Sequence, residues 1–144
     1  MKAGFTVSYT SYLPVVGGAI IRDNDGTIEV LCAQRGPGRA MSGYWEFPGG
    51  KVEPGETEEE ALARELFEEL DISVEVRSHV ATTPYSYDFG DISLSVYVCT
   101  IEEGEPTRSE HQSLEWVPVA DLSDLRWAPA DIPAMEKLRD TLTS

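Results

Sequence analysis

The stretch that decides the fold runs from Gly50 to Ile72 and reads GKVEPGETEEEALARELFEELDI. Thr57, followed three residues later by Glu60, is typical of a capping box, in which each side chain accepts a hydrogen bond from the other residue's backbone N–H. The apolar residues that follow recur at helical spacing and form one arc: Leu62, Ala63, Leu66, Phe67 and Leu70. The sequence therefore predicts a helix from Thr57 to about Leu70, with this arc packed on a sheet.

The segments on either side of this helix have the composition of strands. Short runs rich in β-branched and apolar residues are bounded by turns of Gly, Asp, Asn and Pro. The predicted strands are Val15–Ile21, Ile28–Ala33, Tyr44–Phe47, Val74–Val80, Ile92–Ile101 and Leu114–Val117. A last helix is predicted from the spacing of Ile132, Met135, Leu138 and Leu142, with Asp131 as its N-cap. This order predicts an α/β (α+β mixed) fold, with a mixed sheet covered on both faces.

Composition excludes several classes of function. The chain has 144 residues, which predicts a single domain spanning 1–144. With 11 basic and 26 acidic residues the net charge is −15, which disfavours binding to nucleic acid polymers or to anionic membranes. The longest apolar run, Leu13–Ile21, is too short to span a membrane and lacks the flanks of a signal peptide, so we expect a cytoplasmic protein. Cys32 and Cys99 lie in strand-like surroundings and are expected to be buried free thiols.

Three carboxylates on the predicted helix stand at spacings i, i+3 and i+4: Glu65, Glu68 and Glu69. Like charges at these spacings repel by a few tenths of a kcal/mol per pair, about 0.2–0.5, which a solvated acidic helix face tolerates. The alternative is a site for a hard divalent cation, because Mg²⁺ takes carboxylate oxygens and phosphate oxygens together. The glycine pair Gly49-Gly50 ahead of the helix, which lets backbone approach a ligand closely, favours the cation site.

The same residues resemble a known signature. Gly50, Glu56, Arg64-Glu65-Leu66, Glu68-Glu69 and Ile72 have the spacing of the Nudix box, which marks hydrolases of nucleoside diphosphates linked to another moiety. One position departs from it, since Asp71 stands where the box usually has Gly. Asp tolerates the left-handed conformation of a helix C-terminus at some cost, so the departure affects the end of the helix and leaves the carboxylates intact.

The resemblance extends along most of the chain to the MutT-type subgroup and to its CTP pyrophosphohydrolases. The segments that carry it are Cys32–Arg35, Trp45–Glu53, Glu110–Gln112 and Trp127–Pro133. It implies a Nudix-type α/β/α sandwich with a mixed β-sheet between helices. It also implies hydrolysis of nucleoside triphosphates to monophosphate and pyrophosphate in the presence of Mg²⁺, with Mn²⁺ able to substitute.

The resemblance implies roles for individual residues. Glu65 and Glu69 would bind the metal, supported by Glu68, the Gly49 carbonyl and Glu110, while Arg64 orients the acids and Glu56 supports Arg64. Candidate catalytic groups are Glu65, Glu68, Arg64 and Glu110. The resemblance does not decide which acid takes the proton of the attacking water, and Glu65, Glu68 and Glu110 are the candidates.

The substrate side of the site is predicted from the same segments. Arg35 and Lys51 match positions that contact phosphate, and Asp131 matches a position that reads the base. Phe47 is one of several aromatic residues that either stack on a base or fill the core: Tyr44, Trp45, Phe47, Tyr87, Trp116 and Trp127. An ionised Asp must meet donors, which both cytosine and guanine offer. The resemblance favours CTP, dCTP or 5-methyl-dCTP, with 8-oxo-dGTP as the alternative.

Such an enzyme would act alone or as a homodimer on small nucleotides and would clean the nucleotide pool. A candidate of another class is a non-catalytic Nudix-like sensor that binds a nucleotide. Sensors of this kind usually lose carboxylates of the box, and this chain retains them.

Overall fold

The computed structural model describes residues 11–107 and 111–143, and its sheet is built around the strand β1 (Leu13–Asn24). Its second half pairs antiparallel with β2 (Thr27–Arg35), across a turn in which Asp25 and Gly26 have φ values of 55° and 94°. Its first half pairs antiparallel with the short strand β4 (Gly49–Lys51). On its other edge, β1 runs parallel to β6 (Gly90–Glu103). One strand thus joins two halves of the sheet.

The remaining strands complete a mixed sheet. The strand order is β3-β2-β1-β6-β5, where β3 is Trp45–Glu46 and β5 is Ser73–Tyr87. β7 (His111–Pro118) pairs antiparallel with β2. All six predicted strands are present, and most are longer than predicted. In β5 and β6 the reason is that charged and polar residues continue the ladder to the hairpin tip at 87–90.

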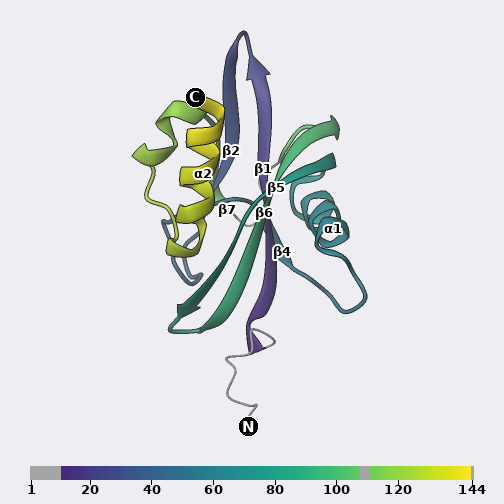
Figure 1. Cartoon of the computed structure of the whole chain (residues 1–144), viewed down its shortest axis with the longest axis vertical. Coiled ribbons are helices and arrows are strands. Elements are labelled where there is room, and N and C mark those ends of the chain that lie inside the picture. Colours follow the sequence, from purple (N-terminus) through teal and green to yellow (C-terminus); the bar gives the residue numbers. More distant parts are fainter. Residues whose placement is uncertain (1–10, 108–110, 144) are drawn as a thin grey trace.

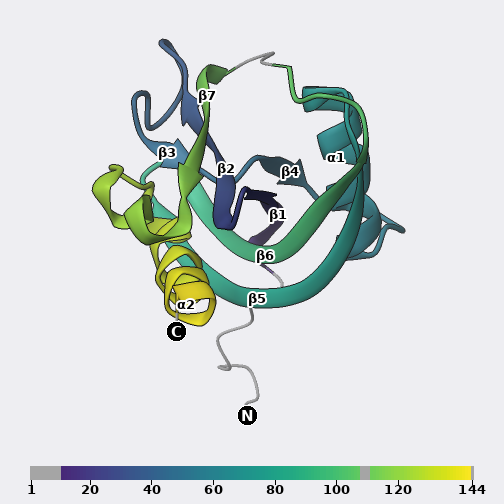
Figure 2. The same cartoon turned by 90° about the horizontal axis from the view of Figure 1, so that it is seen from above.

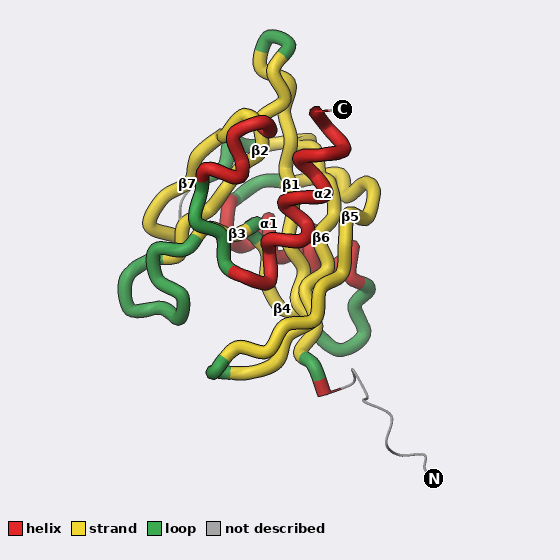
Figure 3. The backbone as a smooth tube through the Cα atoms, turned by 60° about the vertical axis from the view of Figure 1, so that its left-hand side comes forward, coloured by secondary structure: helices red, strands yellow, loops and turns green. Residues whose placement is uncertain are grey.

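Two helices lie on opposite sides of the sheet, as Figures 1 and 2 show: α1 (Glu58–Leu70) and α2 (Ile132–Thr143). Two short 3-10 helices, η3 (Val119–Asp124) and η4 (Pro129–Asp131), lead from β7 into α2 (Figure 3). Two apolar clusters fill the spaces on either side of the sheet. Leu62, Leu66 and Leu70 belong to one, and Ala134, Met135 and Leu138 belong to the other. The expected α/β/α arrangement with a mixed sheet is confirmed.

The capping box of α1 is confirmed. Glu60 N donates to Thr57 Oγ1 at 3.1 Å, and Thr57 N donates to Glu60 Oε1 at 2.9 Å. At the other end Asp71 adopts the left-handed conformation with φ 58°, and its N–H donates to the Phe67 carbonyl. Asp71 therefore closes the helix in the conformation for which Gly is usually chosen.

The predicted apolar face of α1 is wrong at one edge. Phe67 is 59% exposed, whereas the fully buried positions are Ala61, Leu62, Leu66 and Leu70. The helix is rotated so that the side carrying Glu65 faces the sheet, which turns Phe67 outward. The hydrophobic pattern alone did not predict this rotation, because a carboxylate occupies part of the inward face.

Two further observations concern thiols and membranes. Cys32 and Cys99 are free and buried as predicted, and burial raises the pKa of each thiol to about 12. Within residues 11–107 and 111–143, neither helix has the length and apolar character needed to cross a bilayer.

Candidate active site

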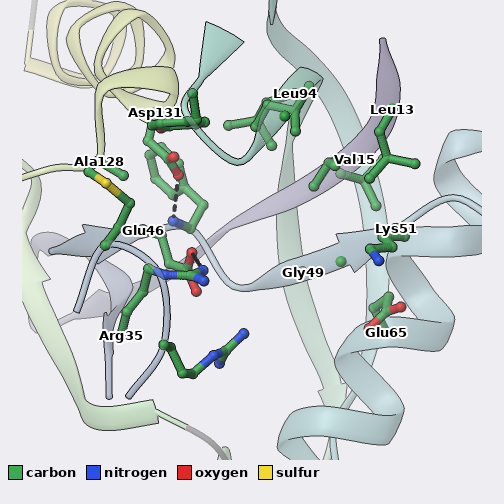
Figure 4. Close-up of a pocket in the computed structure, with 18 of the residues that line it drawn as sticks. Leu13, Val15, Arg35, Glu46, Gly49, Lys51, Glu65, Leu94, Ala128 and Asp131 are labelled. Atoms are coloured by element: carbon green, nitrogen blue, oxygen red, sulfur yellow. Dashed lines mark hydrogen bonds and ion pairs between the residues drawn. The ribbon is translucent and has the colours of Figure 1, made fainter. Parts of the chain in front are cut away.

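A cavity of about 630 Å³ opens where β1, β4 and α1 meet the β5–β6 hairpin and the segment before α2. One end is lined by the glycine pair and by residues of the box: Gly49, Gly50, Lys51, Glu53, Glu65 and Glu69. The other end is lined by polar side chains from four separate segments: Arg35, Glu46, His111 and Asp131. Figure 4 shows Gly49, Lys51 and Glu65 on one side of the view and Glu46 and Asp131 on the other.

Glu65 is fixed against the backbone of β4. A Cβ atom placed on Gly50 would overlap the Glu65 carboxylate, so glycine at position 50 creates the space that this carboxylate occupies. The side chain of Glu65 is only 14% exposed. Burial raises its pKa, although the Arg64 guanidinium beside it acts in the opposite direction. The site therefore holds a partly desolvated carboxylate whose charged form a cation would stabilise.

Arg64 binds the Glu65 carboxylate and three other groups near it. Its guanidinium forms a two-point ion pair with Glu56, at 2.6 and 3.0 Å, and contacts Glu65 at 3.1 Å and Glu68 at 3.2 Å. It also donates to the Lys51 carbonyl at 3.1 Å. The hydrogen bonds from Arg64 and from the Glu53 N–H lower the pKa of Glu56 to about 2. Arg64 thus joins the loop before α1, strand β4 and the acids of α1.

The acids of α1 divide into two groups. Glu65 and Glu69 line the cavity, whereas Glu68 is 58% exposed, is bound to Arg64 and does not line it. Within the described residues no three His, Cys, Asp or Glu side chains already converge as a metal cage. Glu110, the fourth acid expected at the metal, lies outside the described residues.

The donor set at this end of the cavity fits a hard divalent cation. Glu65 and Glu69 supply two carboxylates beside the backbone of Gly49, and carboxylate and carbonyl oxygens are the ligands that Mg²⁺ prefers. A small number of protein ligands also suits Mg²⁺, which keeps several waters and shares substrate phosphates.

The opposite end of the cavity is organised by Glu46, which our sequence interpretation did not single out. Its carboxylate accepts hydrogen bonds from Arg35 at 2.8 Å and from His111 Nε2 at 3.0 Å. Burial alone would raise the pKa of Glu46, but the His111 hydrogen bond and the Arg35 charge hold it below the usual value. The available signal was a charged residue inside the aromatic strand Trp45–Phe47, since such residues are seldom buried without a partner.

Arg35 and His111 are both committed to this end of the site. Arg35 Nε donates to the Ala40 carbonyl at 2.6 Å in addition to its contact with Glu46. His111 is buried, and among the described residues its Nδ1 has no hydrogen-bond partner. The pair therefore fixes the Glu46 carboxylate from two sides.

Asp131 has a different structural role from the helix cap that the sequence predicts. It lies in η4, and its Oδ2 accepts a hydrogen bond from the backbone N–H of Phe47 at 2.9 Å. Burial raises the pKa of Asp131 well above its usual value, and the negative charge of Glu46 raises it further. The shift widens the pH range in which Asp131 is neutral, and the neutral acid can donate a hydrogen bond as well as accept one.

Two of the aromatic candidates line the cavity. Phe47 is 3% exposed and packs on Trp127 with ring centroids 4.8 Å apart. Tyr87 lies on β5, where its hydroxyl accepts from the Ala130 N–H at 2.9 Å and its ring stacks on Phe89. The other candidates (Tyr44, Trp45, Trp116 and Trp127) are not among the lining residues.

Comparison with known proteins identifies the family. The sequence model of the protein family described as the NUDIX domain matches residues 12–138 of this chain. The chain is 39% identical over 118 residues to the CTP pyrophosphohydrolase of Escherichia coli strain K12, covering 82% of this chain and 86% of that protein. It is 34% identical over 127 residues to the 8-oxo-dGTP diphosphatase of the same strain, covering 88% and 96%.

A solved structure gives the same result. The solution structure of the MutT protein, a Nudix hydrolase, from methicillin-resistant Staphylococcus aureus 252 superimposes with a TM-score of 0.73 at 45% identity. The superposition covers 90% of this chain and 97% of that one. This chain belongs to the NUDIX family and is a hydrolase of acid anhydrides of the MutT type.

Proposed function

We propose that this chain hydrolyses the bond between the α- and β-phosphates of nucleoside triphosphates, so that one water yields a nucleoside monophosphate and pyrophosphate. The observation that carries the proposal is the composition of the cavity. Acids and glycines suited to a divalent cation and phosphates line one end, and four polar groups suited to a base line the other. A nucleotide could therefore occupy both ends at once.

Nudix hydrolases generally use divalent metal ions such as Mg²⁺. In this chain Glu65 and Glu69, with the Gly49 carbonyl, would hold the ion, and Mn²⁺ would be able to replace it. When bound, the ion would neutralise phosphate charge and lower the pKa of the attacking water. A protein with a net charge of −15 needs such neutralisation to accept a triphosphate.

The chain's own cations would complete the binding of phosphate. Lys51 lies on β4 beside the glycine pair and lines the cavity next to Glu65. Arg64 would hold the Glu65 carboxylate in place through its 3.1 Å contact, while Glu56 fixes Arg64. Arg35 would act closer to the base than to the phosphates, because two of its nitrogens already bind Glu46 and the Ala40 carbonyl.

We favour cytidine-type substrates: CTP, dCTP or 5-methyl-dCTP. Cytosine presents an exocyclic amino donor beside a ring-nitrogen acceptor. The ionised Glu46 accepts hydrogen bonds, and the neutral form of Asp131 can donate one. The segment from Trp127 to Pro133, which carries Asp131, also resembles the cytidine-acting relatives.

The second candidate substrate is 8-oxo-dGTP. The Escherichia coli relative that matches the larger part of this chain is named for that activity. An oxidised guanine also presents a donor and an acceptor side by side, so the polar groups at the base end do not exclude it.

A nucleotide panel tests the proposal. Purified protein is incubated with CTP, dCTP, 5-methyl-dCTP, 8-oxo-dGTP and dGTP, with Mg²⁺ or with EDTA, and the products are separated by ion-exchange chromatography. We expect monophosphate and pyrophosphate in equal amounts, only with the metal, and the highest kcat/KM for a cytidine nucleotide. Binding without turnover of any nucleotide would favour the non-catalytic sensor. A higher kcat/KM for 8-oxo-dGTP would reverse the substrate preference.

A further inference from the structure

A chain of polar side chains crosses the interface between α1 and the sheet, outside the cavity. Glu58, the first residue of α1, accepts hydrogen bonds from Tyr97 Oη at 2.6 Å and from Ser95 Oγ at 3.0 Å. Ser95 Oγ lies 2.8 Å from Thr82 Oγ1, which lies 2.7 Å from His79 Nε2. Ser95 gives its only hydroxyl proton to Glu58, so it must accept from Thr82, and Thr82 must accept from His79.

The part of this polar chain on β6 is buried, whereas Thr82 and His79 are exposed. Ser95 is completely buried, and Tyr97 is 8% exposed and belongs to the apolar cluster that contains the buried leucines of α1. Burial and the neighbouring Glu58 carboxylate raise the pKa of the Tyr97 phenol, which therefore stays protonated and able to donate. Buried polar groups cost free energy when they lack partners. The hydroxyls of Ser95 and Tyr97 both have their acceptor only when the Glu58 carboxylate lies within hydrogen-bond distance of the two.

Glu58 and Glu65 share one stripe of α1. They are seven residues apart, which at 3.6 residues per turn is close to two full turns, so both side chains point toward the sheet. Leu62 lies between them and is fully buried. Apolar packing is non-directional and tolerates small slides and rotations of a helix. Hydrogen bonds have fixed lengths and angles, so they can define the position that leucine packing leaves open.

We propose that Glu58 is a positioning residue, whose hydrogen bonds to Ser95 and Tyr97 set the axial position and rotation of α1 and thereby place Glu65 and Glu69 beside the glycine pair. The proposal rests on the function proposed above, because it assumes that these two acids hold the metal. Glu65 is sensitive to such placement, since its carboxylate lies against β4 at a point where a Cβ on residue 50 would overlap it. Glu58, Ser95 and Tyr97 are not among the residues that line the cavity.

The test compares two adjacent acids. Glu58→Ala removes both hydrogen bonds. The control Glu59→Ala removes the same charge from the next residue of the first turn of α1, which is exposed. Tyr97→Phe removes one hydrogen bond and leaves the Glu58 side chain unchanged. Glu58→Gln keeps the length of the side chain and retains one acceptor and one donor. Each variant is checked for thermal midpoint and circular dichroism, then assayed over a range of Mg²⁺ and nucleotide concentrations.

We expect Glu58→Ala to lower kcat roughly tenfold or more, because misplacement of reacting groups by about 1 Å costs up to ~10²-fold. The Mg²⁺ concentration for half-maximal rate should rise while KM for the nucleotide stays within about twofold. Tyr97→Phe should shift the same quantities less, Glu58→Gln should restore most of the loss, and Glu59→Ala should behave as the parent.

A readout independent of turnover separates this inference from the proposed function. Mn²⁺ binding to each variant is measured by electron paramagnetic resonance without nucleotide, and weaker binding is expected in Glu58→Ala and Tyr97→Phe than in Glu59→Ala. Equal Mn²⁺ affinity and equal kcat in Glu58→Ala and Glu59→Ala, with only a lower thermal midpoint, would overturn the positioning role. If Glu58→Ala fails to fold, unchanged kcat and Mn²⁺ affinity in Tyr97→Phe would overturn it. A parent protein that binds Mn²⁺ but releases no pyrophosphate would instead overturn the proposed function.

Discussion

Arg64 connects more of the site than any other single residue described above. Its guanidinium binds Glu56, Glu65 and Glu68 and the backbone of Lys51. An arginine suits this role because its planar fork donates in several fixed directions, which a lysine ammonium does not. The contacts place the titration of Glu56 far below neutral pH, and this has a measurable effect on stability.

Replacing Glu56 should make the acid dependence of stability weaker. The pKa of Glu56 is lowered to about 2 in the folded protein and returns to about 4.5 on unfolding. A lowered folded-state pKa means that the stabilisation is complete above about pH 4.5 and is lost as the pH falls toward 2. The thermal midpoint of Glu56→Gln should therefore lie below that of the parent at pH 7, and the gap should close between about pH 5 and pH 2. A gap independent of pH would contradict the ion pair.

Glu65→Gln and Glu69→Gln should each lower turnover by roughly 10²-fold or more, because a divalent ion contributes several kcal/mol of charge stabilisation to the reaction. The fold should persist, since removing one of several neighbouring negative charges relieves repulsion on α1. Single-turnover rates and circular dichroism measure the two effects. Glu68→Gln is a useful comparison, because Glu68 is exposed and does not line the cavity. Parent-like turnover in both Glu65 and Glu69 variants would exclude them as metal ligands.

Asp131→Ala and Asp131→Asn should differ in stability. Alanine leaves the buried N–H of Phe47 without its acceptor, at a cost of about 1–3 kcal/mol, whereas asparagine keeps an acceptor and resembles the neutral acid. We expect a lower thermal midpoint and an altered ratio of kcat/KM for dCTP and 8-oxo-dGTP in Asp131→Ala, and smaller changes in Asp131→Asn. An unchanged ratio in both variants would leave Asp131 a purely structural role.

At the scale of secondary structure, helix α1 shows how far the sequence is informative. Its start was predictable because the capping box involves only residues three apart, and its end was predictable from the hydrophobic pattern. Its rotation was not, because the inward face also carries Glu65, which the pattern counts as polar. The contact between Asp131 and Phe47 joins residues 84 apart in sequence, and no local rule predicts it. Glu46 was missed for the same reason, since its partners are supplied by β2 and β7.

Asp71→Gly should stabilise the end of α1. Asp71 has φ 58°, a conformation that costs L-residues about 1–2 kcal/mol in general, less for Asp, and that glycine adopts freely. We expect a higher thermal midpoint with unchanged kcat, because Asp71 does not line the cavity. Thermal melts of the parent, Asp71→Gly and Asp71→Ala provide the measurement, with alanine expected to destabilise. A midpoint that falls in Asp71→Gly would show that the Asp side chain contributes a contact at this position.

At the scale of the whole molecule, the net charge of −15 makes stability depend on cations. Unspecific screening by salt relieves self-repulsion at any part of the surface. A bound divalent ion acts differently, because it stabilises the folded state by mass action, about 2.7 kcal/mol at a concentration 100 times its Kd.

Mg²⁺ should therefore raise the thermal midpoint beyond the effect of NaCl at equal ionic strength. The extra rise should disappear in Glu65→Gln and after addition of EDTA, while the protein stays folded, since its two apolar clusters need no metal. Differential scanning calorimetry measures both effects. The same extra rise in Glu65→Gln and in the parent would show that Mg²⁺ binds elsewhere.

The position of β1 in the sheet has a consequence for the order of assembly. β1 begins at Leu13, yet its parallel partner β6 covers residues 92–99 opposite it. During synthesis the first strand and the helix with its glutamates therefore emerge well before the strand that completes the centre of the sheet. Pairings this distant in sequence slow folding, because a long loop must close before the contacts form. A chain that stops before β6 would hold the whole Nudix box and still lack Ser95 and Tyr97, the two residues that donate hydrogen bonds to Glu58 of α1.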